Sequence, residues 1–176
     1  MNEKQETRKQ HTSLRGIIIV LAAAGALAVL AAIFFAPVLQ VIGSSMDPAL
    51  PEGSCVVSVK TSNVKAGQVV AFDYNNKILV KRIIATEGEW IDIDKDGTVT
   101  VNSQILTEPY VSDPSMGECD IDFPYQVPEG KVFVMGDKRS RSIDSRSSAV
   151  GCIGEDQLIG KIVFCVWPFG NFGIVH

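Results

Sequence analysis

The strongest constraint on this chain is a long uncharged segment near its start. From Gly16 to Met46 there is no charged residue, and Gly16–Ala36 is apolar throughout. At about 1.5 Å per residue, a helix over this stretch reaches roughly 30 Å, the thickness of the hydrocarbon core of a bilayer. A cleaved secretory segment is the alternative, but its apolar part is usually only about 7–15 residues long. The sequence therefore predicts a retained transmembrane helix over residues 16–36.

The charges that flank this segment predict its orientation. Residues 1–15 carry four basic and two acidic side chains, a net charge of +2, and the whole chain has a net charge of -4. Basic residues before a spanning helix keep that end in the cytoplasm. We therefore expect a cytoplasmic tail over 1–15 and a domain outside the cytoplasm over 37–176. The acidic balance of the chain excludes a nucleic-acid partner.

After Pro37 the pattern changes to short apolar runs rich in Val, Ile and Phe, each bounded by turn-forming residues. Such runs are typical of β-strands. They cover Ser54–Val59, Gln68–Asp73, Ile78–Ala85, Trp90–Asp94, Thr98–Val101, Lys131–Met135 and Lys161–Trp167. The predicted fold is mainly β, with an antiparallel core. The stretch from Thr107 to Gln126 carries three prolines and five acidic residues, and we expect it to be a surface excursion from this core.

Cysteine and histidine usage narrows the chemistry. The four cysteines are widely spaced, so they do not resemble a zinc site. Outside the cytoplasm a disulfide is permitted, and its pairing stays open. Cys55 and Cys165 lie in apolar runs, and we expect them to be buried thiols. The only histidines are His11, before the apolar segment, and His176, the last residue. This argues against a Ser-His-Asp triad and against a histidine-rich metal site, and we expect no metal and no cofactor.

Two segments offer a nucleophile and a base. Gly43-Ser44-Ser45-Met46-Asp47-Pro48 can present a serine hydroxyl beside backbone N–H groups, although a polar linker would have a similar composition. In Ile78–Ile84, strand alternation places Lys81 on the face of Leu79 and Ile83, and Arg82 on the other face. One cation must then share a face with core aliphatics. Burial lowers the pKa of a lysine, so Lys81 can become a general base. An edge strand with two solvated charges is the alternative.

A third segment, Val132–Arg146, runs from an apolar strand through Gly136 into alternating acidic, basic and hydroxyl residues. Its alternative interpretation is a charged surface loop. Taken together and in this order, GSSMDP after an apolar anchor, VKRIIATEGE and VFVMGDKRSRSIDSR resemble the bacterial type I signal peptidase family. The resemblance extends from the anchor to Trp167-Pro168-Phe169 and so covers nearly the whole chain.

The resemblance implies roles for individual residues. Ser45 matches the nucleophile, Lys81 the general base, and Ser142 a serine that orients that lysine. The remaining polar matches, which the family uses to hold the site together through ion pairs, are Arg82, Asp137, Arg139, Asp144 and Arg146. The family fold has a variable β region inserted between the lysine and aspartate motifs, here roughly 87–130. Lys138 departs from the family, which usually has asparagine there, and Gly43 stands where some members supply an oxyanion hydroxyl.

The implied activity is removal of signal peptides from secreted preproteins by a membrane-bound serine endopeptidase. Preproteins and the lipid bilayer would be its partners. Two functions stay open beside it: processing of a narrow client such as a pilin, and a non-catalytic membrane-tethered β domain. A self-cleaving Ser-Lys repressor shares related β architecture, but the apolar anchor and the absence of a DNA-binding domain argue against it.

Overall fold

The computed structural model describes residues 16–27 and 37–176, which belong to two units divided after Pro37. In the first unit, residues 16–27 form an α-helix. Among the described residues, no helix combines the length and the apolarity needed to cross a membrane. The predicted span over 16–36 continues into 28–36, which lies outside the described residues, as does the predicted tail over 1–15.

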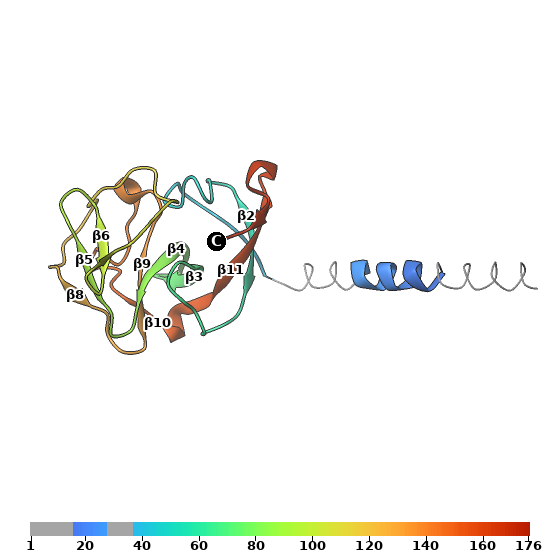
Figure 1. Ribbon diagram of the computed structural model, residues 1–176, viewed down its shortest axis with the longest axis horizontal. Coiled ribbons are helices and arrows are strands. Elements are labelled where there is room, and N and C mark those ends of the chain that lie inside the picture. The colour runs from blue at the N-terminus through green and yellow to red at the C-terminus, as the bar shows by residue number, and fades with distance from the viewer. Residues whose placement is uncertain (1–15, 28–36) are drawn as a thin grey trace, which may run out of the picture. The chain divides into compact units, whose positions relative to one another are not determined.

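The second unit, Val38–His176, is built from two antiparallel sheets, so the predicted antiparallel β fold is confirmed. The larger sheet has the order β1-β2-β11-β3-β4-β9-β10, with β12 paired to β11, and the smaller has the order β7-β6-β5-β8. In Figure 1, β3, β4 and β9 lie in the middle of the unit, with β5, β6 and β8 on one side and β2 and β11 on the other.

The strands of the larger sheet are β1 (Val38–Gln40), β2 (Cys55–Val59), β3 (Val69–Tyr74), β4 (Lys77–Thr86), β9 (Lys131–Met135), β10 (Ile153–Gly154), β11 (Leu158–Trp167) and β12 (Gly173–Ile174). Those of the smaller sheet are β5 (Trp90–Ile93), β6 (Val99–Val101), β7 (Gln104–Ile105) and β8 (Tyr125–Gln126). Three short 3₁₀ helices complete the unit: η1 (Arg139–Arg141), η2 (Glu155–Gln157) and η3 (Phe169–Asn171).

A two-residue turn sets the register of the central hairpin. Asn75 and Asn76 join β3 to β4, and both have positive φ, +48° and +60°. Such a turn matches the twist of the strands it connects, and asparagine tolerates this conformation. The resulting register pairs Val70 with Lys81 and Val69 with Arg82. The turn therefore determines where along the sheet the two cations lie.

Three apolar clusters fill the unit, and β4 contributes to all of them. Val80 packs in one cluster with Val56 and Met46, Ile84 in a second, and Ile83 in a third. Both faces of β4 are covered from Val80 to Ala85, and every side chain in that part of the strand is buried. Both cations are therefore buried, and not only one.

The four cysteines are free thiols. Cys152 and Cys165 are buried, whereas Cys55 and Cys119 are half-buried. Cys165 packs in the cluster that includes Val56, as expected of a small apolar side chain. The expected burial is thus confirmed for Cys165 and wrong for Cys55, which is only half-buried. Cys55 begins a strand that lies next to the edge strand β1.

Candidate active site

Ser45 lies in the loop that follows β1, and its apolar neighbours hold that loop in place. Met46 and Leu50 are fully buried in a core cluster, and the Leu50 N–H donates to the Met46 carbonyl at 2.8 Å. Burial of a side chain of this size contributes about 1.5–3 kcal/mol. The Asp47 N–H also donates to the Ser44 carbonyl, which closes a turn around Ser45. The serine is thus presented on a short, well-anchored turn.

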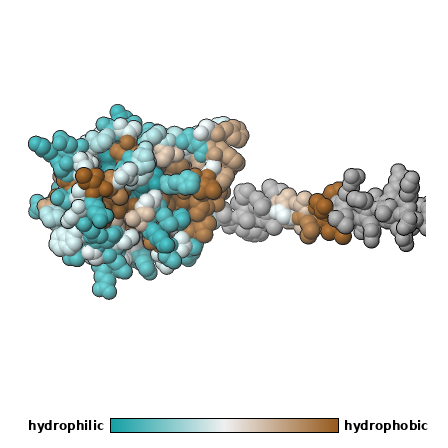
Figure 2. All heavy atoms as spheres, viewed as in Figure 1, coloured by the Kyte–Doolittle hydropathy of each residue, from teal (hydrophilic) through white to brown (hydrophobic). Residues whose placement is uncertain are grey.

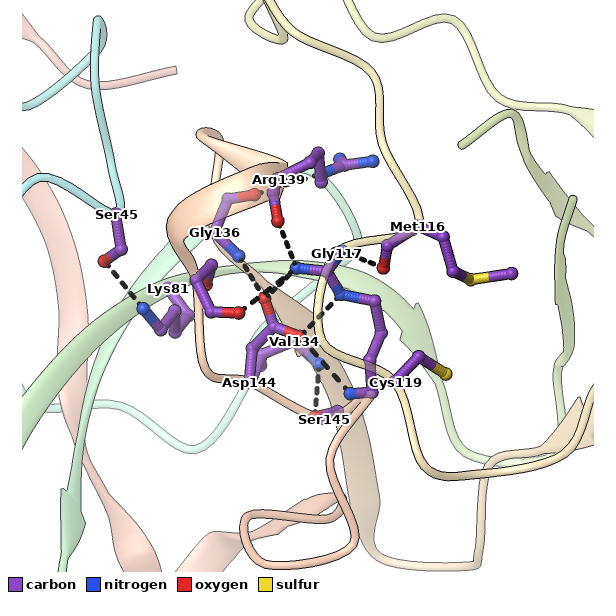
Figure 3. A network of polar contacts seen from close by, with 12 residues as sticks. Ser45, Lys81, Met116, Gly117, Cys119, Val134, Gly136, Arg139, Asp144 and Ser145 are labelled. Atoms are coloured by element: carbon purple, nitrogen blue, oxygen red, sulfur yellow. Dashed lines mark hydrogen bonds and ion pairs between the residues drawn. The ribbon is translucent and has the colours of Figure 1, made fainter. Parts of the chain in front are cut away.

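Lys81 comes from the middle of β4 and points at this serine. Its Nζ donates to Ser45 Oγ at 2.6 Å, although the two residues are 36 positions apart in the sequence. The Lys81 side chain is almost completely buried, with 3% exposure. Figure 3 shows Ser45 and Lys81 directed toward each other at one side of a polar network that includes Gly136, Arg139 and Asp144.

Burial changes the chemistry of this amine. The pKa of Lys81 is lowered from 10.5 to about 8, and loss of water is the largest cause. The nearby charge of Asp144 raises this pKa, that of Arg146 lowers it, and that of Asp137 raises it again. The balance leaves a lysine that loses its proton near neutrality. A neutral amine in hydrogen-bond contact with a hydroxyl can accept its proton.

The loop after β9 packs directly against the Ser45 turn, and Gly136 makes this possible. A Cβ on residue 136 would lie 2.6 Å from the Ser45 carbonyl oxygen and 2.6 Å from Ser142 Cβ, closer than atoms can approach. The Lys138 N–H donates to the same Ser45 carbonyl at 3.0 Å. The Lys138 side chain also pairs with Asp47 at 3.5 Å. Two polar contacts and one glycine therefore fix the nucleophile turn to this loop.

Two buried ion pairs lie close enough to Lys81 for their charges to affect it. Arg82 binds Asp137 through two hydrogen bonds of 2.8 Å, with both side chains almost fully buried. Arg146 binds Asp144 in the same two-pronged way, at 2.8 and 2.9 Å. Two parallel hydrogen bonds give such pairs a fixed geometry as well as charge neutralisation.

The two carboxylates in these pairs respond differently to burial. Burial raises the pKa of Asp137, because it outweighs the effect of Arg82. Burial also opposes ionisation of Asp144, but the hydrogen bonds and charge of Arg146 lower its pKa overall. Asp144 additionally accepts the Gly136 N–H at 2.9 Å. The same carboxylate thus acts on Lys81 and holds the glycine against the nucleophile turn.

Ser142 lies at this site without the contact that the resemblance implies. Its side chain is buried against Gly136, yet its hydroxyl has no hydrogen-bond partner among the residues that the structure describes. The structure therefore joins Ser45 to Lys81, and each arginine to its carboxylate, through polar contacts. Ser142 only packs beside them.

Sequence reasoning missed the residues that cover this network from the stretch after β7. Glu108 binds Arg139 at 2.5 and 3.0 Å, and Arg82 lies over the Tyr110 ring, 4.0 Å from its centre. One signal was available: the residues matched to ion-pairing roles include three arginines and only two aspartates, so a third carboxylate was needed.

No metal site accompanies these residues. Within 16–27 and 37–176, no three His, Cys, Asp or Glu side chains are grouped as metal ligands.

Comparison with known proteins places the chain among signal peptidases. The model of the family "Signal peptidase, peptidase S26" matches residues 14–167. Signal peptidase I of Bacillus licheniformis is 34% identical, over 97% of this chain and 97% of the relative. Signal peptidase IB of Staphylococcus aureus strain COL is 38% identical, over 74% of this chain and 77% of the relative. A crystal structure of a signal peptidase I from Enterococcus faecalis V583 is 27% identical, with a TM-score of 0.48, and covers 59% of this chain and 98% of that one.

Proposed function

The chain belongs to the peptidase S26 family, as a bacterial type I signal peptidase, and from this premise we propose that it cleaves with Ser45 as nucleophile and Lys81 as general base. It is a serine endopeptidase that removes signal peptides. The observation that carries the proposed roles is the 2.6 Å contact between Lys81 Nζ and Ser45 Oγ at a buried position.

The first half of the reaction forms an acyl-enzyme. With Lys81 neutral, the Ser45 hydroxyl donates its proton to Nζ while Oγ attacks the scissile carbonyl carbon. The tetrahedral intermediate collapses when the new Lys81 ammonium returns this proton to the leaving amine. The carbon–nitrogen bond breaks, the mature protein leaves, and the signal peptide remains esterified to Ser45. Lys81 is then neutral again and ready for a second proton transfer.

The second half repeats the steps with water. Lys81 takes a proton from a water molecule, whose oxygen attacks the ester carbon. When the ester bond to Ser45 breaks, Lys81 returns the proton to Oγ. The signal peptide departs as a carboxylic acid, and both residues regain their starting state. One amine thus serves as base and acid in each half-reaction.

Backbone amides of the nucleophile turn supply the oxyanion donors. The Ser45 and Met46 N–H groups have no acceptor among the described residues, so they are available to a negatively charged oxygen. Gly43, two residues before the nucleophile, carries no hydroxyl, which leaves this role to the backbone. Donors fixed in place before the reaction stabilise developing charge without reorganising.

A groove beside the Ser45–Lys81 pair fits an extended substrate. Its volume is about 600 Å³, and it is lined by residues 38–42 and 76–81 together with Ser45. The lining includes aliphatic side chains such as Leu39, Ile42 and Leu79. Because β1 is the end strand of its sheet, its outer edge is unpaired within the described residues. An extended peptide can add to such an edge through main-chain hydrogen bonds.

We propose further that this enzyme works at the membrane surface, with 1–15 in the cytoplasm, 16–36 across the bilayer and 37–176 outside, including an inserted region over 87–130. Exposed apolar side chains on neighbouring elements at one end of the larger sheet support the proposed contact with lipid. Figure 2 shows apolar side chains gathered along one flank of the folded unit. Exposed apolar residues on β1, β2, β11, β12 and η3 include Val38, Val59, Trp167, Phe169 and Ile174. Aromatic residues favour membrane interfaces.

Cleavage assays with single variants test the catalytic roles. The full chain in detergent micelles is incubated with a preprotein, and the mature product is followed on gels. Ser45→Ala should be inactive because it removes the attacking hydroxyl. Lys81→Arg should be inactive because guanidinium keeps its proton in this pH range. Lys95→Arg, an exposed lysine in the turn between β5 and β6, is the control and should cleave normally. Circular dichroism verifies the fold of each variant. Cleavage by folded Lys81→Arg near the wild-type rate would rule out the Ser-Lys mechanism.

The topology has a separate test. Protease added to intact protoplasts that contain the full chain should degrade the β unit and leave a fragment that includes residues 16–36. A protected β unit would contradict the orientation.

A further inference from the structure

Between β7 and β8, the segment 108–117 contacts Arg82, Arg139 and Arg146, the three buried arginines near the proposed base. We call this segment the arginine cover. The Tyr110 ring lies against Arg82, and both oxygens of Glu108 bind Arg139. The backbone carbonyls of Met116 and Ser115 accept from Arg146 Nη1 at 2.6 and 3.3 Å. Tyr110 also donates its hydroxyl hydrogen to Glu108 at 3.0 Å. The cover is thus built around one carboxylate and one aromatic ring.

Each of these arginines is in turn joined to a group behind Lys81. Arg82 binds Asp137, and Arg146 binds Asp144. Arg139 donates from Nε to the carbonyl of Gly136, the glycine that packs against the nucleophile turn. The cluster therefore links the cover to the Ser45 turn through direct contacts, and its charges act on Lys81.

The cluster consists of six side chains, and these are neutral together only because Glu108 is one of them. Beyond these six, Arg82 Nη1 also donates to the backbone oxygens of Gly67 and of the last residue, His176. The three arginines and the two aspartates would leave one positive charge uncompensated, and Glu108 cancels it. Glu108 is itself mostly buried in this pair, and Arg139 has no exposed side-chain surface. Charges in such surroundings are weakly screened, so the loss of one is felt at neighbouring groups.

We propose that Glu108 is a positioning residue of the active site: its carboxylate fixes Arg139 and keeps the polar cluster behind Lys81 electrically neutral, which sets how readily Lys81 takes up a proton. This inference rests on the proposed role of Lys81 as base. Without Glu108 the cluster carries a net positive charge, and a protonated Lys81 becomes less favourable.

The charged groups that act on Lys81 come from one side. Asp137, Asp144 and Arg146 belong to the loop after β9. The neighbouring strand β3 places Val70 opposite Lys81, and the loop after β1 places Ser45 there.

Two further pairs of charged residues lie near these groups: Arg139 with Glu108, and Lys138 with Asp47. The charges of Arg139 and Glu108 act on the pKa of Asp137 in opposite directions, which connects the cover to this set. Lys138 and Asp47, which flank the nucleophile turn, pair with each other.

The test measures pH dependence in two ways on the full chain in detergent micelles. One readout is the acidic limb of kcat/KM for preprotein cleavage, and the other is the ¹³Cε shift of Lys81 in ¹³C-lysine protein, assigned as the resonance missing from Lys81→Arg. A unit charge about 10–20 Å away changes a pKa by roughly 0.6–1.2 units at an effective dielectric near 20. Glu108→Gln should therefore move both midpoints to lower pH by about half a unit or more. Glu118→Gln removes an exposed carboxylate of the same stretch and should move neither.

Opposite charge changes separate this effect from structural damage. Arg139→Gln should move both midpoints to higher pH, and Glu108→Gln/Arg139→Gln should bring them back to the wild-type position. Damage to the fold would instead shift all three variants in one direction or lower their rates without a shift. These two variants also serve as the test if Glu108→Gln alone does not fold.

The outcomes distinguish this inference from the proposed function. If the activity limb coincides with the Lys81 titration in the wild type but neither moves in Glu108→Gln, the inference is wrong and the base stands. If the Lys81 titration moves as expected while the activity limb never follows it, Glu108 acts as inferred and Lys81 is not the base.

Discussion

The pH dependence of cleavage is the most direct consequence of the buried lysine. Burial, partly countered by neighbouring carboxylates, lowers the pKa of Lys81 from 10.5 to about 8. At pH 7 this leaves about 9% of the molecules with a neutral amine, against about 0.03% for a solvated lysine. The difference is a factor of about 300 in the concentration of active base. Since only the neutral amine can accept the Ser45 proton, this factor appears directly in kcat/KM.

The expected profile follows from the sign of this shift. Raising the pH removes the proton from Lys81, so kcat/KM should rise about tenfold per pH unit in the acidic range, reach half its maximum near pH 8, and level off above it. The assay is cleavage of a signal-peptide substrate by the full chain in detergent micelles at low substrate concentration, with circular dichroism at each pH. A flat profile between about pH 6 and 9 in folded protein, or a midpoint near the value of a solvated lysine, would refute the reasoning.

Three further expectations concern stability and packing. Lys81→Met should raise the free energy of unfolding by up to about 3 kcal/mol in urea titrations at a pH below 8. The pKa of Lys81 is lower in the folded than in the unfolded protein, so its protonated amine destabilises the fold there. The gain should vanish above about pH 10.5, where the amine is neutral in both states. Gly136→Ala should lower cleavage on the order of a hundredfold while the circular dichroism spectrum stays native, since its Cβ would displace the Ser45 carbonyl. Asp137→Ala should lower the free energy of unfolding by about 3–5 kcal/mol in the same titrations, because it removes the buried carboxylate that neutralises Arg82. A loss under about 1 kcal/mol would mean that water or the backbone oxygens of Gly67 and His176 satisfy the guanidinium instead.

Most strands that contain a clear run of Val, Ile and Phe between turn-forming residues could be predicted from the sequence. The run Lys131–Met135 was predicted with the bounds that the structure shows, and Ile78–Ala85 differs from β4 by one residue at each end. The run at 161–167 began three residues late, because Gly160 interrupts the apolar pattern where β11 shifts register. The strand β1 was not predicted, because it lies inside the uncharged stretch 16–46, where no polar residue before Gln40 marks an alternation.

The site could be predicted only as far as its motifs are local. Ser45, Lys81 and the polar residues of 136–146 could be identified as candidates because they lie in three short segments. Glu108 could not, because its partner Arg139 is 31 residues away and the intervening stretch has no periodicity. Alternation along 78–84 also predicted one buried cation where the structure buries two, because it describes the faces of a strand and not how many of them are covered.

The arrangement around Lys81 is a compromise between base strength and availability. Burial alone would push its pKa lower still, and an amine that is almost always neutral is a poor acceptor for a hydroxyl proton. Asp144 and Asp137 counter burial, and Arg146 limits how far they do so. Both aspartates can remain near the amine only because their arginine partners are buried with them, and three arginines require a third carboxylate. A chain with no histidine close to its nucleophile in sequence can in this way tune a lysine, at the expense of burying six charges that must cancel.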